Sequence, residues 1–165
     1  MRRPTPDTPA PGQESVWEYP RPPRVEPVDE RVTIRLGGEV IADTRSAVRV
    51  LETSHPPVYY VPIADFVAGA LADAAGSSLC EFKGAARYFD VQGGGILRAG
   101  AAWNYPQPSP GFETLTDKVA VYAGPMDECT VGDEVVSPQP GGFYGGWVTS
   151  SVAGPFKGIP GSMGW

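Results

Sequence analysis

The chain has few of the side chains that bind metals or build disulfide frameworks. Its 165 residues include two cysteines, Cys80 and Cys129, and a single histidine, His55. Two cysteines are too few for a disulfide framework, so we expect a reduced, cytoplasmic protein, with one bridge between them as the open alternative. The three residues lack the close ligand pairs of structural zinc sites, such as Cys-x-x-Cys. We therefore expect no metal and no other cofactor.

Positive charge and long apolar runs are also scarce. The formal net charge is -6 and the pI is about 4.7. An acidic protein repels phosphate backbones, which argues against nucleic acid as a partner. No stretch approaches the roughly 18 apolar residues of a membrane span, so we expect no membrane association. The Gly-x-x-x-x-Gly-Lys-Ser/Thr phosphate loop and the Gly-x-Ser-x-Gly nucleophile elbow are both missing, which excludes the best-marked nucleotide and hydrolase sites.

Glycine, proline and aromatic residues are abundant instead. The sequence has 21 glycines and 19 prolines together with four tryptophans, seven tyrosines and six phenylalanines. The aromatic side chains can build a core, and the glycines and prolines predict many turns. Residues 1–16 are proline-rich with almost no apolar side chains, which predicts a disordered tail. We expect one domain over residues 17–165, with a glycine- and aromatic-rich C-terminal extension from residue 138.

Alternating apolar and polar residues predict a mainly β, antiparallel fold. Residues 32–36 and 39–43 alternate around Gly37-Gly38, a pattern typical of a hairpin with a two-residue turn. Further strands are expected over residues 47–52, 58–61, 101–105, 118–122 and 128–131. Residues 63–75 place apolar side chains at helical spacing among alanines, and Gly76 follows as a stop signal. This pattern predicts one short helix near residues 63–75.

The stretch 79–91 combines β-forming residues with ionisable groups, and it predicts a second hairpin. A strand alternates its side chains, so Cys80 should share a face with Phe82 while Glu81 and Lys83 share the other. Cys80 is then predicted to be a core residue, and Glu81 and Lys83 are the candidate catalytic acid and base. The alternative is an exposed ion pair with Arg87 that contributes little to stability.

A second unusual stretch places aromatic rings beside glycine-rich backbone near residues 138–147. Such rings can form a concave wall for a planar or cationic ligand, with Glu52, Glu81 or Lys83 holding its polar end. The alternative is that these rings belong to the core. The predicted ligand-binding residues are Glu52, His55, Tyr60, Arg87, Trp103, Tyr105, Tyr144 and Trp147.

One tripeptide occurs twice. Phe82-Lys83-Gly84 returns as Phe156-Lys157-Gly158. The repeat indicates either two related halves of the chain or a coincidence between short matches.

Several segments together resemble the domain-of-unknown-function family 427. They include Leu51-Glu52-Thr53-Ser54-His55-Pro56-Pro57, Cys80-Glu81-Phe82-Lys83-Gly84 and Ala102-Trp103-Asn104-Tyr105-Pro106. The resemblance covers Trp17 to about Val136, and the segment after it looks like an extension found in some bacterial members. It implies a partly open barrel or tent-like sheets. The family also carries a nucleotidyltransferase-like label, but this chain lacks the Gly-Ser and Asp-x-Asp pattern of those enzymes, so that activity is not carried over.

Two hypotheses for function follow. The first is a metabolite-binding domain, with or without an enzymatic reaction, whose pocket combines the glutamate, lysine and aromatic residues named above. The second is a non-catalytic interaction or self-association module that uses the C-terminal segment, which would make the protein a homodimer.

Overall fold

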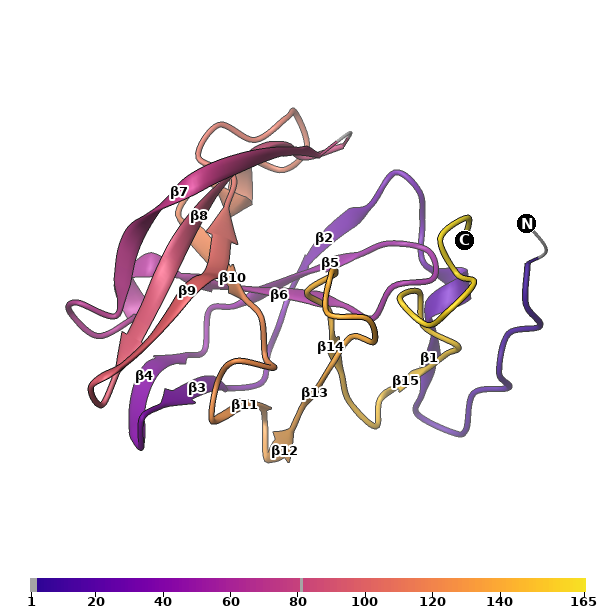
Figure 1. Ribbon diagram of the computed structural model, residues 1–165. Helices are drawn as coiled ribbons and strands as arrows, with labels where there is room; N and C mark the ends of the chain where they lie inside the picture. The colour runs from indigo at the N-terminus through magenta and orange to yellow at the C-terminus, as the bar shows by residue number, and fades with distance from the viewer. Residues whose placement is uncertain (1–2, 81) are drawn as a thin grey trace.

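The fold consists of two antiparallel sheets and a set of short strands contributed by the two ends of the chain. The computed structural model describes residues 3–80 and 82–165. One sheet has seven strands in the order β2-β5-β6-β10-β9-β8-β7, and the other has four in the order β12-β11-β3-β4. Figure 1 shows β7, β8 and β9 rising above the four-stranded sheet. In the described part of the chain neither sheet closes on itself, which confirms the predicted mainly β, open architecture.

The elements have the following bounds. The strands of the larger sheet are β2 (Arg24–Pro27), β5 (Val48–Leu51), β6 (Val58–Pro62), β10 (Lys118–Val121), β9 (Ile96–Asn104), β8 (Gly84–Gly93) and β7 (Leu71–Cys80). Those of the smaller sheet are β12 (Glu134–Val135), β11 (Glu128–Val131), β3 (Val32–Leu36) and β4 (Glu39–Thr44). The short strands are β1 (Glu14–Ser15), β13 (Ser137–Pro138), β14 (Trp147–Val148) and β15 (Val152–Ala153), and the 3-10 turns are η1 (Val16–Glu18), η2 (Ile63–Asp65) and η3 (Glu113–Leu115).

The central strands of the larger sheet carry buried apolar side chains on both faces, because successive residues alternate between two apolar clusters. Val61 and Ala102 face the smaller sheet, where the main core also contains Ile34 and Ile41. Their neighbours along the chain, including Tyr60 and Trp103, face the opposite side and form a second cluster. The period of two thus supplies a packed core on one face and a largely aromatic surface on the other.

The predicted helix near residues 63–75 is wrong. The structure has a single 3-10 turn at Ile63–Asp65, and β7 begins at Leu71. Gly69 has a φ of 81°, which a right-handed helix cannot accommodate. The ten residues of β7 pair instead with β8 at the edge of the larger sheet. Sheet pairing therefore overrides the helix propensity of the alanines.

The hairpin predicted within residues 79–91 exists, but its turn comes earlier than expected. β7 ends at Cys80 and β8 starts at Gly84, so Phe82 and Lys83 lie in the turn and not on a strand. Strand alternation therefore does not place Cys80 and Lys83 on opposite faces. Glu81 lies outside the described residues.

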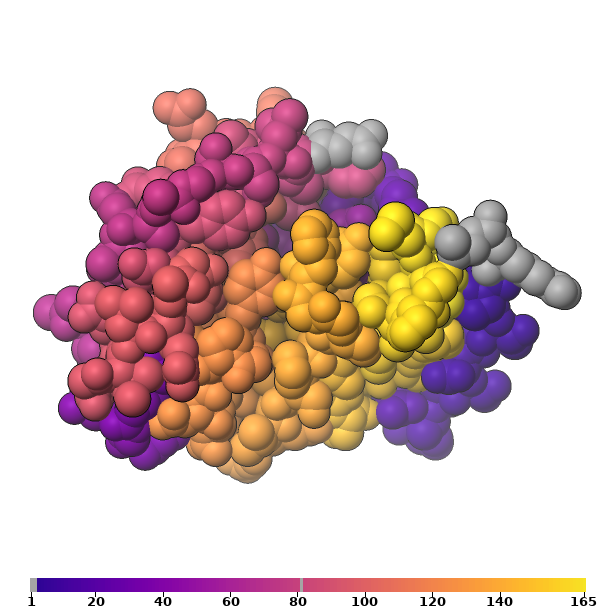
Figure 2. Space-filling model, in the orientation of Figure 1, coloured from indigo at the N-terminus to yellow at the C-terminus, as the bar shows by residue number. Residues whose placement is uncertain are grey.

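The two ends of the chain pack together. β1 pairs in parallel with β15, and the indole nitrogen of Trp17 donates a hydrogen bond to the carbonyl of Pro155 at 2.9 Å. Figure 2 shows the C-terminal residues beside the N-terminal ones on one side of the molecule. Ser15 and Val16, which belong to the predicted tail, are buried in this contact.

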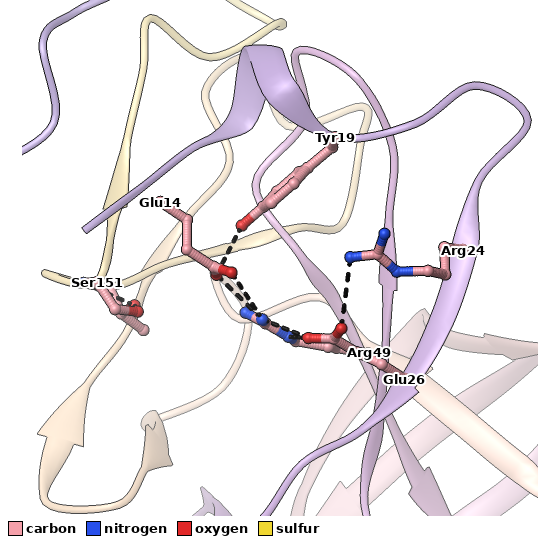
Figure 3. A network of polar contacts seen from close by, with 7 residues as sticks. Glu14, Tyr19, Arg24, Glu26, Arg49 and Ser151 are labelled. Carbon is pink, nitrogen blue, oxygen red and sulfur yellow. Dashed lines mark hydrogen bonds and ion pairs between the residues drawn. The ribbon is translucent and has the colours of Figure 1, made fainter. Parts of the chain in front are cut away.

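An arginine on β5 ties the N-terminal segment to the larger sheet. The guanidinium of Arg49 donates to Glu26 on β2 at 2.6 Å and lies 3.0 Å from Glu14 on β1. Tyr19 donates its hydroxyl to the same Glu14 at 3.2 Å. Figure 3 shows Arg49 between the two carboxylates, with Arg24 on the far side of Glu26. The network places a charged cross-link where the first strand meets the sheet.

Both cysteines are free thiols, so the alternative of a bridge between them is wrong. Cys129 is buried in the main core, where burial raises the pKa of its thiol to about 12. No helix in the described ranges combines the length and the apolar character needed to cross a membrane.

Candidate functional site

A cavity of about 600 Å³ lies against the aromatic face of the larger sheet. Its lining comes from the sheet, called the sheet wall below, and from the loop after β5 and the C-terminal segment, called the C-terminal wall below, which includes Tyr144 and Lys157. A second cavity of about 610 Å³ is lined by residues of Ala99–Ala101 and Pro138–Gly146, but none of the described residues that line it is charged. The first cavity therefore combines ionisable groups with aromatic rings, as small-molecule sites do.

The sheet wall is aromatic because β6 and the end of β9 direct rings into the same space. Tyr60 comes from β6, Trp103 from β9 and Tyr105 from the residue after β9. The rings of Tyr60 and Tyr105 have centroids 6.5 Å apart, and those of Trp103 and Tyr122 are 4.7 Å apart. Burial is the main cause that raises the pKa of the Tyr60 and Tyr105 hydroxyls well above the usual range. Both hydroxyls therefore remain protonated near neutral pH.

The C-terminal wall reaches the sheet through a glycine. A Cβ atom on Gly145 would lie 2.0 Å from the ring of Trp103, so only glycine allows this approach. The hydroxyl of Tyr122 donates to the carbonyl of Phe143 at 3.1 Å and holds the same segment in place. The side chain of Phe143 itself is 76% exposed at the rim of the cavity.

A buried glutamine fixes the single histidine. The Nε2 amide group of Gln139 lies 2.9 Å from the carbonyl of Lys157 and 3.0 Å from Nδ1 of His55, while its Oε1 accepts from the amide of Gly146 at 3.0 Å. The bond from Gly146 fixes the orientation of the Gln139 amide, so Nδ1 of His55 must accept a hydrogen. The proton of the neutral imidazole then sits on Nε2, which lies 3.8 Å from Glu52.

His55 is neutral at physiological pH. Burial, followed by the positive charges of Lys157, Arg21 and Lys83, lowers the pKa of its imidazole to about 4. The ring of Tyr144 packs edge-on against it at 4.8 Å. The imidazole is thus a fixed hydrogen-bond donor toward the side of Glu52.

Two lysines approach the cavity from opposite walls. Nζ of Lys83 lies 5.8 Å from the ring centroid of Tyr105, and Nζ of Lys157 lies 5.5 Å from that of Tyr144. Lys157 also donates to the backbone oxygen of Trp165 at 3.1 Å. Cation–π contacts of this kind hold each ammonium group beside a ring.

Most of the predicted site residues meet in this cavity. The lining includes Glu52, His55, Tyr60, Lys83, Trp103, Tyr105 and Tyr144. Cys80, predicted to be a core residue, is half-buried and packs on the aromatic cluster, yet it also lines the cavity.

Two predicted ligand-binding residues lie elsewhere. Arg87 does not line the cavity and forms an ion pair with Asp73. Trp147 is 1% exposed in the main core, where it stacks on Tyr59 at 5.2 Å and donates to the carbonyl of Val121. Glu81, the predicted catalytic partner of Lys83, lies outside the described residues.

Sequence reasoning missed several residues of the site, among them Tyr122, Gln139 and Lys157. The repeated Phe-Lys-Gly tripeptide could have found one of them, because its two lysines, Lys83 and Lys157, line the same cavity. Gln139 gave no such signal, since its role depends on a fold that brings it to His55.

A family model matches the part of the chain that forms the sheet wall of the cavity, but not the C-terminal segment. The model of a domain of unknown function, DUF427, matches residues 24–132, which run from β2 to the residue after β11. The match includes the sheet wall of the cavity and leaves out Gln139, Tyr144 and Lys157. No curated protein matches the chain. Because the family match spans more than half of its length, the chain belongs to the DUF427 family of domains of unknown function.

Proposed function

We propose that this protein is a small-molecule-binding domain whose ligand occupies the aromatic cavity. The observation that carries the proposal is a cavity of about 600 Å³ in which aromatic rings line the walls beside two lysines, a glutamate and a neutral histidine. Cavities of roughly 300 to 1,000 Å³ with apolar walls and a few polar groups are typical of small-molecule sites. The reduced state of Cys80 and Cys129 supports a cytoplasmic location.

The polar groups of the cavity are held in place before any ligand arrives. Gln139 fixes the ring of His55, and Gly145 sets the distance between the C-terminal wall and Trp103. A preformed site loses less entropy on binding than a flexible one. An enzymatic reaction belongs to the same proposal, with Lys83 as the residue that contacts the ligand and Glu81 as its partner.

The proposal is tested by measuring the melting temperature of the protein against a library of small organic acids, amides and amines. A ligand at about 100 times its Kd stabilises the folded state by about 2.7 kcal/mol, which is roughly 5 to 10 °C for a domain of this size. We expect at least one compound to produce such a rise. We also expect Lys83→Ala to abolish that rise without changing the melting temperature of the free protein.

Arg87→Ala is the matched control. Arg87 lies on the same hairpin as Lys83 and carries the same charge, but it does not line the cavity. It should leave the ligand-induced rise intact. The proposal fails if no compound raises the melting temperature, or if Lys83→Ala and Arg87→Ala have equal effects.

A further inference from the structure

We infer that the cavity selects organic anions, namely a planar aromatic body that carries a carboxylate. This inference rests on the proposed function and names the class of ligand. It is argued from the charges on the two walls, from the hydrogen-bond donors between them and from the arrangement of the rings.

The first argument is charge. Lys83 comes from the β7–β8 turn and Lys157 from the C-terminal segment, so two ammonium groups meet in one cavity although they are far apart in the sequence. Neither lies within ion-pair distance of a carboxylate side chain of another described residue. The only described carboxylate of the lining, that of Glu52, lies 3.7 Å from the guanidinium of Arg21 outside the lining. The described side chains of the lining therefore carry two ammonium groups against one carboxylate, and Lys157 also donates to the backbone oxygen of Trp165.

The second argument is hydrogen bonding. Gln139 occupies Nδ1 of His55, so the imidazole offers an N–H donor from Nε2. The hydroxyls of Tyr60 and Tyr105 keep their protons, and the two ammonium groups have no acceptor capacity. A carboxylate is a hydrogen-bond acceptor only, so it matches a site in which these donors outnumber the single described carboxylate, that of Glu52. An ammonium ligand would face two like charges and few acceptors.

The rings of the lining favour a planar body. Trp103 and Tyr122 have ring centroids 4.7 Å apart with their planes inclined by 46°, and the rings of Tyr60, Tyr105 and Tyr144 line the same cavity. A flat aromatic ligand can make stacked and edge-on contacts with these rings, and such contacts add to the apolar burial. The sequence alone left a planar or a cationic ligand open, and the two lysines favour a planar anion.

The test uses ligands that share a ring and differ in charge. The first series has an indole ring whose side chain is negative in indole-3-acetate, neutral in indole-3-acetamide and positive in tryptamine. The second series has a naphthalene ring and consists of naphthalene-2-carboxylate, the corresponding amide and the corresponding methylamine. Kd values are measured by titration calorimetry at pH 7 and low salt. We expect each carboxylate to bind at least tenfold more tightly than its amide, and each amine to bind most weakly.

Variants assign the preference to the lysines. Lys83→Met and Lys157→Met should each reduce the preference for carboxylate over amide about tenfold, whereas Arg87→Met should leave it unchanged. Circular dichroism establishes that each variant is folded. A preference that survives in folded lysine variants would overturn the inference.

The single histidine provides a readout in the unmodified protein. Its C2–H proton resonance reports the titration of His55, whose ring faces Glu52, Gln139, Tyr144 and Lys157, with Lys83 and Arg21 in range. A bound carboxylate should raise the pKa of His55 relative to the bound amide, since a negative charge favours the imidazolium. An unchanged pKa on carboxylate binding would count against the inference.

The outcomes separate this inference from the proposed function. If amides or amines bind as tightly as the carboxylates, the selection of anions is wrong and small-molecule binding stands. A further outcome is that neither ring series binds while another compound produces a rise in melting temperature that depends on Lys83. In that case the selection of aromatic anions is wrong, and small-molecule binding again stands. If no compound binds, both fail.

Discussion

The neutral state of His55 depends on its burial and on three nearby cations. Burial disfavours the charged imidazolium, and Lys157, Arg21 and Lys83 all oppose a further positive charge on the ring. In the unfolded chain these constraints are absent and the imidazole titrates near its ordinary pKa of about 6.5. The folded state therefore binds fewer protons than the unfolded state between pH 4 and 6.5, so His55 makes the protein less stable as the pH falls through this range.

A pH series tests this effect at one residue. The difference between the unfolded pKa and the folded value of about 4 corresponds to a loss of about 3 kcal/mol between pH 7 and pH 4. His55→Asn keeps an acceptor for Gln139 and cannot become protonated. The variant should therefore lose about 3 kcal/mol less than the natural protein over this interval, as measured by urea unfolding at both pH values. Equal losses would show that His55 titrates normally in the folded state.

The residues of the site were predictable where their chemistry stood out along the chain. Lys83, Trp103 and Tyr105 belong to distinctive short motifs, and the structure brings them together. Trp147 also belongs to a distinctive aromatic stretch, but its side chain packs in the main core and does not face the cavity. Which side a ring faces is set by sheet register and by packing, and a local motif does not encode either.

Among the elements, the β8–β9 turn of the larger sheet and the β3–β4 turn of the smaller sheet are in contact. A Cβ atom on Gly94, in the β8–β9 turn, would lie 1.9 Å from the carbonyl oxygen of Gly37 in the β3–β4 turn. The backbones therefore touch where the larger and the smaller sheet meet. Gly95 also has a positive φ, but no atom lies within 4 Å of its Cβ position. Substitutions at Gly94 and Gly95 can therefore distinguish the cost of a backbone clash from the cost of a left-handed backbone conformation.

Alanine at each glycine should give different losses of stability. Gly95→Ala incurs only the left-handed conformation, which costs about 1 to 2 kcal/mol. Gly94→Ala adds a backbone clash, and overpacking costs about 1 to 3 kcal/mol more. Urea unfolding of the two variants measures the difference. If both lose the same free energy, the contact between the two turns contributes nothing.

The sequence predicted the β3–β4 hairpin correctly, but it did not predict the conformation of the alanine-rich segment at residues 63–75. The hairpin of β3 and β4 follows directly from alternation around Gly37 and Gly38, both of which have positive φ. In residues 63–75 the helical spacing produced no buried face, since Ile63 is 40% and Val67 is 50% exposed. The segment becomes an edge strand because β8 offers it a partner, which is a tertiary effect that sequence periodicity does not contain.

At the scale of the whole molecule, the C-terminal segment is part of the core although it lies outside the family match over residues 24–132. Trp147 fills the space beside Tyr59, and its backbone amide donates to the carbonyl of Pro57 at 2.9 Å. Self-association through this segment is therefore not tested by deleting it, because the deletion also removes core side chains. Phe143 and Met163 remain available for contacts with a partner, since they are 76% and 84% exposed.

Removal of the buried tryptophan should destabilise the whole domain. Trp147→Ala should lower the free energy of unfolding by about 3 to 5 kcal/mol, and deletion of residues 138–165 should abolish cooperative unfolding, because a whole domain is stable by only about 5 to 15 kcal/mol. Phe143→Ala is the control, since an exposed side chain of the same segment should cost under about 0.5 kcal/mol. Thermal and urea unfolding measure all three. A deletion variant that unfolds with the midpoint of the full chain would mean that residues 1–137 contain a complete folding unit and that Trp147 only covers it.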